Sequence, residues 1–188
     1  MKVYKEYLLK NKEKLIIRSS EEKDAEEVLK VYKKKVTETK FLSRGEKDTF
    51  PTVEDLKEGT KWFLEDEKSC DVVAEYLGKI VGTGHIEWYG GKLRSAHTCQ
   101  LDMGILKDYW GLGIGGKIMQ TLIEVAKQGN LEQIELSVVE ENIRAIKMYE
   151  SFGFVATGKQ PHSMKYEDGT YADMVFMTKS LIDSFKLK

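Results

Sequence analysis

The spacing of hydrophobic and polar positions divides the first third of the chain into short predicted elements. Residues 15–18 form an apolar run that predicts a strand, and a Ser-x-x-Glu capping pattern then opens a predicted helix over 19–32. Pro-Thr, with Asp three residues after the Thr, opens a second predicted helix over 51–63. Residues 1–14 are lysine-rich and weakly amphipathic, which predicts either a short helix or a loose arm.

Three strand-like runs follow, at 71–77, 80–89 and 96–106. They are separated by Gly78-Lys79 and by Gly90-Gly91, and both separators are typical of tight hairpin turns. The middle of the chain is therefore predicted to be an antiparallel meander.

The remaining elements alternate between strand and helix. Helical spacing of apolar residues predicts helices over 113–127 and 143–152, with a strand over 134–139 between them. Residues 154–157 and 172–178 are the last predicted strand pair. A meander that passes into a β-α-β-α-β segment predicts an α/β protein with a mixed sheet and helices on both faces.

Composition restricts the class of protein. A length of 188 residues fits one domain, 1–188, and 41% hydrophobic with 32% charged residues is typical of a globular protein. Thirty basic and thirty-one acidic residues leave a net charge of −1, so no overall field attracts nucleic acid or an anionic membrane. Residues 1–15 have no apolar leader core, and no apolar run is long enough to span a bilayer. These features predict a cytoplasmic protein.

The cysteines and histidines do not predict a metal site. Cys70 and Cys99 have no C-x-x-C spacing, which favours reduced, packed thiols. His85, His97 and Cys99 are not joined by any helical or loop ligand pair, so packing between paired strands explains them more simply than a metal does.

A glycine-rich cluster at Tyr109–Lys117 separates a predicted strand from a predicted helix, where free N–H groups and the helix dipole favour an anion. Gly111, Gly113 and Gly116 satisfy G-x-G-x-x-G, but antiparallel-looking strands precede them, which disfavours a dinucleotide fold. The cluster also contains a P-loop core, but Ile118 stands where a hydroxyl would bind Mg²⁺. A flexible turn without a ligand is disfavoured because so many glycines lower stability.

Two motifs carry a resemblance to a known family. Trp110–Gly115 is similar to the signature of the GNAT acetyltransferases, in which Arg or Gln leads x-x-G-x-G/A after the fourth strand, although Trp110 departs from the usual leading residue. Asn142–Phe154 resembles the family's second motif, N-x-x-A-x-x-x-Y-x-x-x-G-F, and the order of elements agrees from Leu15 to Thr178. The chain is thus identified as a member of this superfamily. The resemblance implies a mostly antiparallel sheet of about seven strands, with the fourth and fifth splayed apart.

The resemblance also implies acetyl-CoA as the acetyl donor. In the family the pantetheine arm pairs with the exposed edge of the fourth strand, where an N–H near Ile105 would bind the thioester carbonyl, and the glycine cluster holds the pyrophosphate. The implied cofactor-binding residues are Met103, Gly104, Ile105, Gly111, Leu112, Gly113, Ile114, Gly115, Gly116, Asn142, Ala145 and Tyr149.

Tyr149 is the implied general acid. Its phenol is neutral near pH 7 and can protonate the leaving thiolate. A packed aromatic side chain is the alternative for Tyr149, and a helix cap is the alternative for Asn142, although capping and cofactor contact are compatible.

The general base is less clearly marked. Relatives often carry a glutamate on the fourth strand, where this chain has Cys99 and Leu101. Glu87, His97 and Asp102 are the substitutes, and Glu87 or His97 is favoured.

These residues predict transfer of an acetyl group to a primary amine of a small molecule or a protein, by direct attack in a ternary complex. A non-catalytic acyl-CoA sensor and a nucleotide-binding protein are the alternatives. The acceptor is expected to be determined by the first two helices and by the loop Lys159–Tyr171. A homodimer is also expected, because relatives commonly dimerise through their last strands and Met174–Met177 is apolar on both faces.

Overall fold

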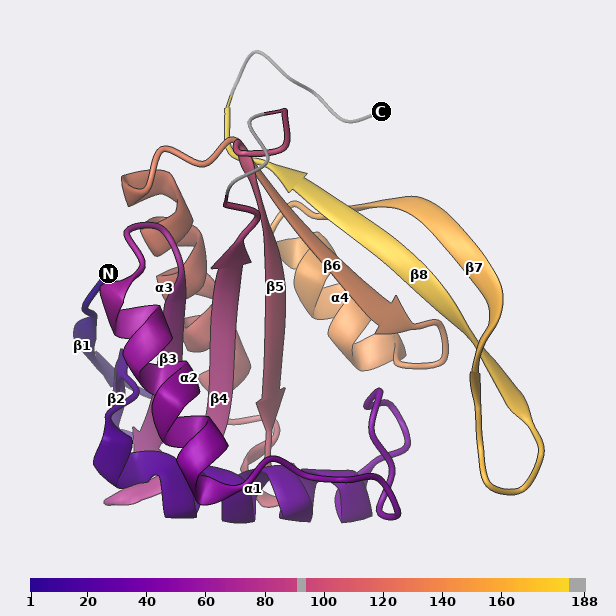
Figure 1. Cartoon of the computed structure of the whole chain (residues 1–188), viewed down its shortest axis with the longest axis horizontal. Coiled ribbons are helices and arrows are strands. Elements are labelled where there is room, and N and C mark those ends of the chain that lie inside the picture. Colours follow the sequence, from indigo (N-terminus) through magenta and orange to yellow (C-terminus); the bar gives the residue numbers. More distant parts are fainter. Residues whose placement is uncertain (91–93, 183–188) are drawn as a thin grey trace.

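The computed structural model describes residues 1–90 and 94–182, and in these ranges one eight-stranded sheet runs in the order β1-β2-β3-β4-β5-β6-β8-β7 (Figure 1). Among the strands of these described ranges, only the pair β5–β6 is parallel. The strands are β1 Tyr4–Leu8, β2 Lys14–Ser19, β3 Cys70–Tyr76, β4 Lys79–Trp88, β5 Thr98–Ile105, β6 Gln133–Val139, β7 Val155–Lys165 and β8 Tyr171–Ser180. The helices are α1 Ala25–Glu38, α2 Val53–Glu65, α3 Ile114–Gln128 and α4 Ile143–Ser151.

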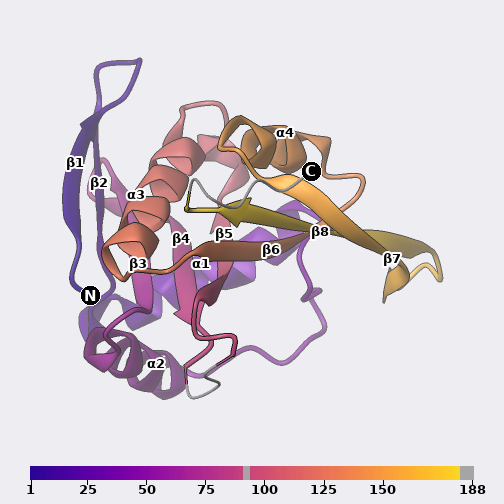
Figure 2. The same cartoon turned by 90° about the horizontal axis from the view of Figure 1, so that it is seen from above.

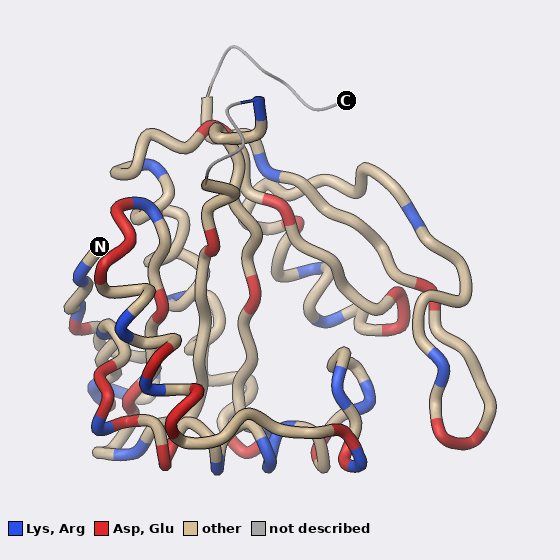
Figure 3. The backbone as a smooth tube through the Cα atoms, in the orientation of Figure 1, with Lys and Arg blue, Asp and Glu red and all other residues tan. Residues whose placement is uncertain are grey.

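The helices cover both faces of the sheet, as predicted. Figure 2 shows α3 and α4 on one face and α1 and α2 on the other. The main core lies beneath α3, where Ile118 and Leu122 are fully buried, and a Cβ at Gly84 would come within 2.6 Å of the Ile118 side chain. Charges of both signs are scattered over α1 and α2 (Figure 3). None of the helices that the structure describes is long and apolar enough to cross a membrane.

The prediction of a helix or a loose arm for residues 1–14 was wrong. Strand β1 pairs with β2 from Tyr4↔Arg18 to Leu8↔Lys14, and the backbone N–H of Val3 donates to the Ser19 hydroxyl at 2.9 Å. Within the described residues the sheet therefore has eight strands, where about seven were expected. A short outer strand that carries lysines is typical of a protected sheet edge, and the alternation of exposed and half-buried side chains along β1 fits that position.

The two predicted helix caps had different outcomes. Ser19 ends β2, and the capping box forms instead between Glu21 and Asp24, ahead of α1. The box predicted at Thr52 and Asp55 is present, with each side chain accepting a hydrogen bond from the other residue's backbone N–H.

The predicted turns are also partly corrected. The β3–β4 hairpin turns at Leu77 and Gly78, whose φ angles are 51° and 72°, one residue earlier than the predicted Gly78-Lys79. A positive φ at both central residues is what a type I′ hairpin turn requires. In the second predicted turn, Gly90 donates to the Trp88 carbonyl, while Gly91 lies outside the described residues.

The last two strands are longer and placed differently than predicted. Strand β7 was expected to end at residue 157, but it continues to Lys165 through two register shifts. One lies between Ala156 and Gly158, and the other, between Gln160 and Met164, contains Pro161. The second shift accommodates a residue without an N–H, and both shifts interrupt the strand pattern in the sequence. Strand β8 lies between β6 and β7, so Met174–Met177 is not the sheet edge that the sequence pattern suggested.

The divergence of β5 from β6 positions the site. The two strands pair only over Thr98–Gln100 with Gln133–Glu135, and then separate (Figure 1). Beyond Gln100, the side of β5 that faces β6 has no strand partner in the part of the chain that the structure describes. This confirms the splayed strand pair implied by the resemblance.

Candidate active site

A cavity of about 790 Å³ opens where β5 and β6 diverge. Its walls come from α1, the connection 39–52, β5, the glycine cluster, β6 and α4. Leu112 is the one predicted cofactor-binding residue that does not line it. The predicted residues that do are Met103, Gly104, Ile105, Gly111, Gly113, Ile114, Gly115, Gly116, Asn142, Ala145 and Tyr149.

The glycine cluster presents backbone donors to this cavity. Gly113 is the N-cap of α3 with a φ of 88°, and no side chain caps the first turn. The N–H groups of that turn therefore have no partner within the helix. A Cβ at Gly111 or Gly113 would meet nothing within 4 Å, so the space beside the loop is open. This geometry suits an anion that approaches the helix N-terminus.

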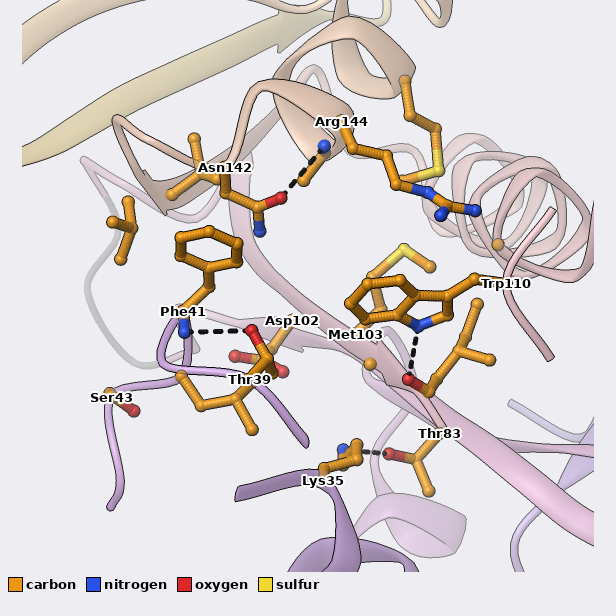
Figure 4. A pocket seen from close by; sticks show the side chains of 18 of the residues that line it. Lys35, Thr39, Phe41, Ser43, Thr83, Asp102, Met103, Trp110, Asn142 and Arg144 are labelled. Atoms are coloured by element: carbon orange, nitrogen blue, oxygen red, sulfur yellow. Dashed lines mark hydrogen bonds between the residues drawn. The ribbon is translucent and has the colours of Figure 1, made fainter. Parts of the chain in front are cut away.

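Trp110 connects this loop to β5 by a hydrogen bond. It is the residue that departs from the family signature. Its indole N–H donates to the Ile105 carbonyl at 2.9 Å (Figure 4). The guanidinium of Arg144, on α4, lies 4.9 Å from the centre of the Trp110 ring. Arg144 thereby adds a positive charge beside the glycine cluster, and the sequence motifs did not single it out.

Asn142 and Tyr149 both come from α4. The Asn142 side chain accepts a hydrogen bond from the Ala145 N–H at 3.2 Å, so its capping role is confirmed. Tyr149 is only 8% exposed and packs against Phe154, with 5.9 Å between ring centres. Burial raises the pKa of the Tyr149 phenol above its ordinary value, and the charge of Asp102 raises it further. The phenol is therefore neutral at physiological pH.

Lys35 lies on the opposite side of the cavity from α4 (Figure 4). Its side chain is buried, with 8% of its surface exposed, and the ammonium donates to the Thr83 hydroxyl at 3.2 Å. It also lies 4.6 Å from the centre of the Tyr32 ring. A Cβ at Gly104 would come within 2.9 Å of the Lys35 Nζ, so the glycine makes room for this charge beside the open edge of β5.

Three ionisable side chains form a row across the sheet beneath α1 and α2. Asp71 on β3 is the register partner of His85 on β4, and His85 is the partner of Asp102 on β5. His85 and Asp102 line the cavity. Burial raises the pKa of Asp71 to about 6, opposed by the charge of His85. Burial lowers the pKa of Lys35 to about 8, opposed by Asp102 and Asp71.

The structure does not bring Glu87 and His97 to this cavity. Glu87 pairs with Gln100, at the end of the sheet where β5 and β6 are still joined, and its side chain is exposed. His97 precedes β5 and is exposed, and its carbonyl accepts hydrogen bonds from the N–H groups of Glu132 and Gln133 at the start of β6. Strand alternation predicts a side chain's face, but not its distance from the point where two strands separate. Within the described ranges, no group of three or more His, Cys, Asp or Glu could hold a metal ion.

The β7–β8 turn contacts the connection 39–52, part of which lines the cavity. Lys47, in the connection 39–52, forms an ion pair with Glu167 at 2.8 Å, and the Lys40 ammonium lies 5.2 Å from the centre of the Tyr166 ring. Both partners belong to the segment Lys159–Tyr171, which is expected from the sequence to help determine the acceptor.

Replacing Lys35 by Met is expected to stabilise the protein at about pH 7, and less so at about pH 10. The folded pKa of about 8 lies below the ordinary 10.5, so the unfolded chain binds more protons between these values. The parent's free energy of unfolding therefore rises with pH in that window, by up to ~3 kcal/mol. Denaturant titrations of parent and variant at both pH values test this. A difference in stability that does not change with pH would contradict it, and Lys34→Met, on the exposed side of α1, is the control.

A family model described as the Acetyltransferase (GNAT) family matches residues 36–154. The chain belongs to this family. It is an N-acetyltransferase, and acetyl-CoA is its acetyl donor.

Individual proteins agree with the family assignment. The spermine/spermidine N(1)-acetyltransferase of Bacillus subtilis is 34% identical over 110 residues, which cover 54% of this chain and 72% of that protein. A GNAT acetyltransferase structure from Streptococcus pneumoniae has a TM-score of 0.85 at 28% identity and covers 89% of this chain and 99% of its own. The fold is also that of the acetyltransferase yncA from Salmonella typhimurium, solved with its cofactor acetyl-CoA, with a TM-score of 0.80, 18% identity, and coverage of 93% and 98%.

Proposed function

We propose that this acetyltransferase transfers the acetyl group of acetyl-CoA to a primary amine of a small molecule or a protein, by direct attack in a ternary complex. One observation carries the proposal: the open edge of β5 and the uncapped N-terminus of α3 face the same cavity. An extended arm that ends in phosphates can engage both at once.

The residues of the cavity fit such a donor. The first-turn N–H groups of α3 would hold the pyrophosphate, with Arg144 beside them. The Leu106 N–H donates to the Val81 carbonyl on β4, and successive N–H groups of a strand point to opposite sides. The Ile105 N–H therefore points away from β4, toward the gap, where it would donate to the thioester carbonyl.

Acetyl-CoA supplies an activated acetyl group. In the transfer, the amine nitrogen forms a bond to the acetyl carbon, the carbon–sulfur bond breaks, and the sulfur leaves with the electron pair. The Ile105 N–H would stabilise the negative charge that develops on the carbonyl oxygen. The Tyr149 hydroxyl would donate its proton to the departing sulfur.

The amine must lose a proton to attack. We propose Asp102, with its register partner His85, for this role in place of Glu87 and His97, because Asp102 and His85 line the cavity. Asp102 would hold the acceptor's ammonium group and accept its proton. From Asp102, the row of ionisable side chains leads through His85 to Asp71 on β3.

Initial-rate kinetics test this function. The protein is supplied with acetyl-CoA and a panel of polyamines, amino acids, aminoglycosides and peptide N-termini, and thiol release is measured. With an active acceptor, double-reciprocal plots are expected to intersect, as direct attack in a ternary complex requires. Parallel lines would indicate an acetylated enzyme and contradict direct attack. A sensor would bind CoA and release no thiol with any acceptor, and the retained Tyr149 at the cavity favours the enzyme.

The cysteines support a cytoplasmic location, which we also propose. Cys70 and Cys99 are free and fully buried, as predicted. Burial raises the pKa of the Cys70 thiol to about 11 and that of Cys99 to about 12, so neither is a reactive thiolate. Unpaired thiols fit a reducing compartment.

A homodimer is expected in solution, through the outer part of the β7–β8 pair. Phe176 is 42% exposed and Tyr171 is 49% exposed, although both lie in a paired strand. Large aromatic side chains that are exposed on the strand pair at the sheet edge would be covered in such an interface. Light scattering at micromolar concentration is expected to give twice the chain mass of 21.6 kDa. A mass of one chain would contradict the dimer.

A further inference from the structure

The charges around the cavity differ between its two ends. Arg144 stands with Trp110 beside the glycine cluster, where the phosphates of the donor are expected. The other end is lined by Lys35 and Arg44, against the single carboxylate of Asp102. Among the described residues, no other Asp or Glu lines the cavity. The acceptor end thus holds more positive than negative side chains.

Lys35 has hydrogen-bonding capacity that the fold does not use. An ammonium has three N–H donors, and the Thr83 hydroxyl is the hydrogen-bond acceptor found for Lys35 among the described residues. No carboxylate of that part of the chain forms an ion pair with Lys35. Leaving a buried charge without a partner is costly, so an anionic oxygen in the cavity would complete this site.

The position of Lys35 limits how far an anion can be from the reacting amine. The Lys35 Nζ lies against Gly104, next to Ile105, whose N–H faces the gap. An anionic group bound by Lys35 therefore lies close to the thioester, and the amino group must be only a few bonds away from it. Asp102, two residues before Gly104 on β5, is placed to hold that amino group.

Apolar side chains predominate in the remaining walls of this end, beside the hydroxyl groups of Tyr32, Thr39 and Ser43. These walls are formed by the C-terminal half of α1 and the connection 39–52, and the apolar residues that contribute are Val36, Phe41, Leu42, Phe50 and Pro51. Such walls suit a hydrocarbon substituent better than a chain with further charges.

We infer that the acceptor is an α-amino acid with an apolar side chain, whose carboxylate binds Lys35 and Arg44 and whose amino group is held by Asp102. This inference rests on the proposed function and names its substrate class. Polyamines are disfavoured because their additional ammonium groups would lie against Lys35 and Arg44 without carboxylate partners.

Matched acceptors test the inference directly. Leucine is compared with 3-methylbutylamine, and phenylalanine with phenethylamine, because each pair differs only in the carboxylate. Spermidine is the polycationic acceptor. We expect kcat/KM to be at least ~30-fold higher for the amino acid in each pair, since removal of one partner of a buried charge pair has an effect of this size. Equal or better turnover of the decarboxylated amines, or of spermidine, would overturn the inference while leaving acetyl transfer to an amine intact.

Two variants separate carboxylate binding from a general role of Lys35. Lys35→Met and Arg44→Gln are each expected to raise KM for leucine at least ~10-fold and to leave 3-methylbutylamine unaffected. Lys34→Met, a change of the neighbouring exposed lysine, is the matched control and is expected to change neither. An equal loss with both acceptors would mean that Lys35 serves the thioester instead, and would overturn the inference. The matched acceptors on the parent protein test the inference independently of both variants. No thiol release with any acceptor would contradict the proposed function itself.

Discussion

Replacing Tyr149 by Phe is expected to lower kcat by ~10² to 10⁴, the contribution typical of general acid catalysis, with little change in the affinity for acetyl-CoA. The substitution deletes one transferable proton and keeps the ring that packs against Phe154. No hydrogen bond joins the Tyr149 hydroxyl to another residue that the structure describes, so stability should change little. Steady-state kinetics with a saturating acceptor, together with melting curves, measure both effects.

Tyr76→Phe is the matched control. Tyr76 is also buried, but it lies outside the cavity, and its hydroxyl accepts a hydrogen bond from Asn11. We expect this variant to keep the parent's kcat. If Tyr149→Phe also kept it, another group or water would protonate the sulfur, and the role of Tyr149 would be withdrawn.

CoA is expected to raise the melting temperature of the parent by about 5–10 °C at a hundredfold excess over its Kd. At that excess, binding to the folded state adds ~2.7 kcal/mol to the free energy of unfolding. Gly113→Val should abolish this shift. A valine would be strained at a φ of 88°, and its side chain would extend into the open space beside the loop, where the phosphates are expected.

Gly169→Val separates lost binding from backbone strain. Gly169 has a φ of 86°, and a Cβ there also meets nothing within 4 Å, but it lies in the β7–β8 turn and does not line the cavity. Both variants should melt earlier than the parent, and only Gly169→Val should retain the shift with CoA. Loss of the shift in both, or in neither, would contradict the assignment of the glycine cluster.

The donor half of the site could be predicted from the sequence because local chemistry defines it. The loop before α3 has left-handed backbone at Gly111 and Gly113, with φ angles of 86° and 88°, and such positions favour glycine. The cap and the tyrosine on α4 are seven residues apart, nearly two helical turns. Such local spacings can be recognised in the sequence without knowledge of the tertiary fold. The splayed strands and the helices on both faces followed from the resemblance and the element order.

The acceptor half depends on contacts between distant segments. Asp102 and His85 form a row only through the register of β4 with β5, and a strand's own pattern does not contain that register. The sequence does contain a signal for Lys35. At helical spacing, Lys35 lies on the same helix face as Val28 and Val31, which is buried against the sheet. A lysine on an otherwise apolar stripe, within a run of three lysines, is unusual enough to be recognised from the helical spacing alone.

The most direct test of the central claim is mass spectrometry of the acceptor after incubation with isotopically labelled acetyl-CoA. We expect the labelled acetyl group on the acceptor's nitrogen, with one thiol released for each product molecule, and loss of both signals in Gly113→Val. A protein that gains stability with CoA but labels no amine and releases no thiol with any acceptor of the panel would be a sensor, and would contradict the assignment of a transferase.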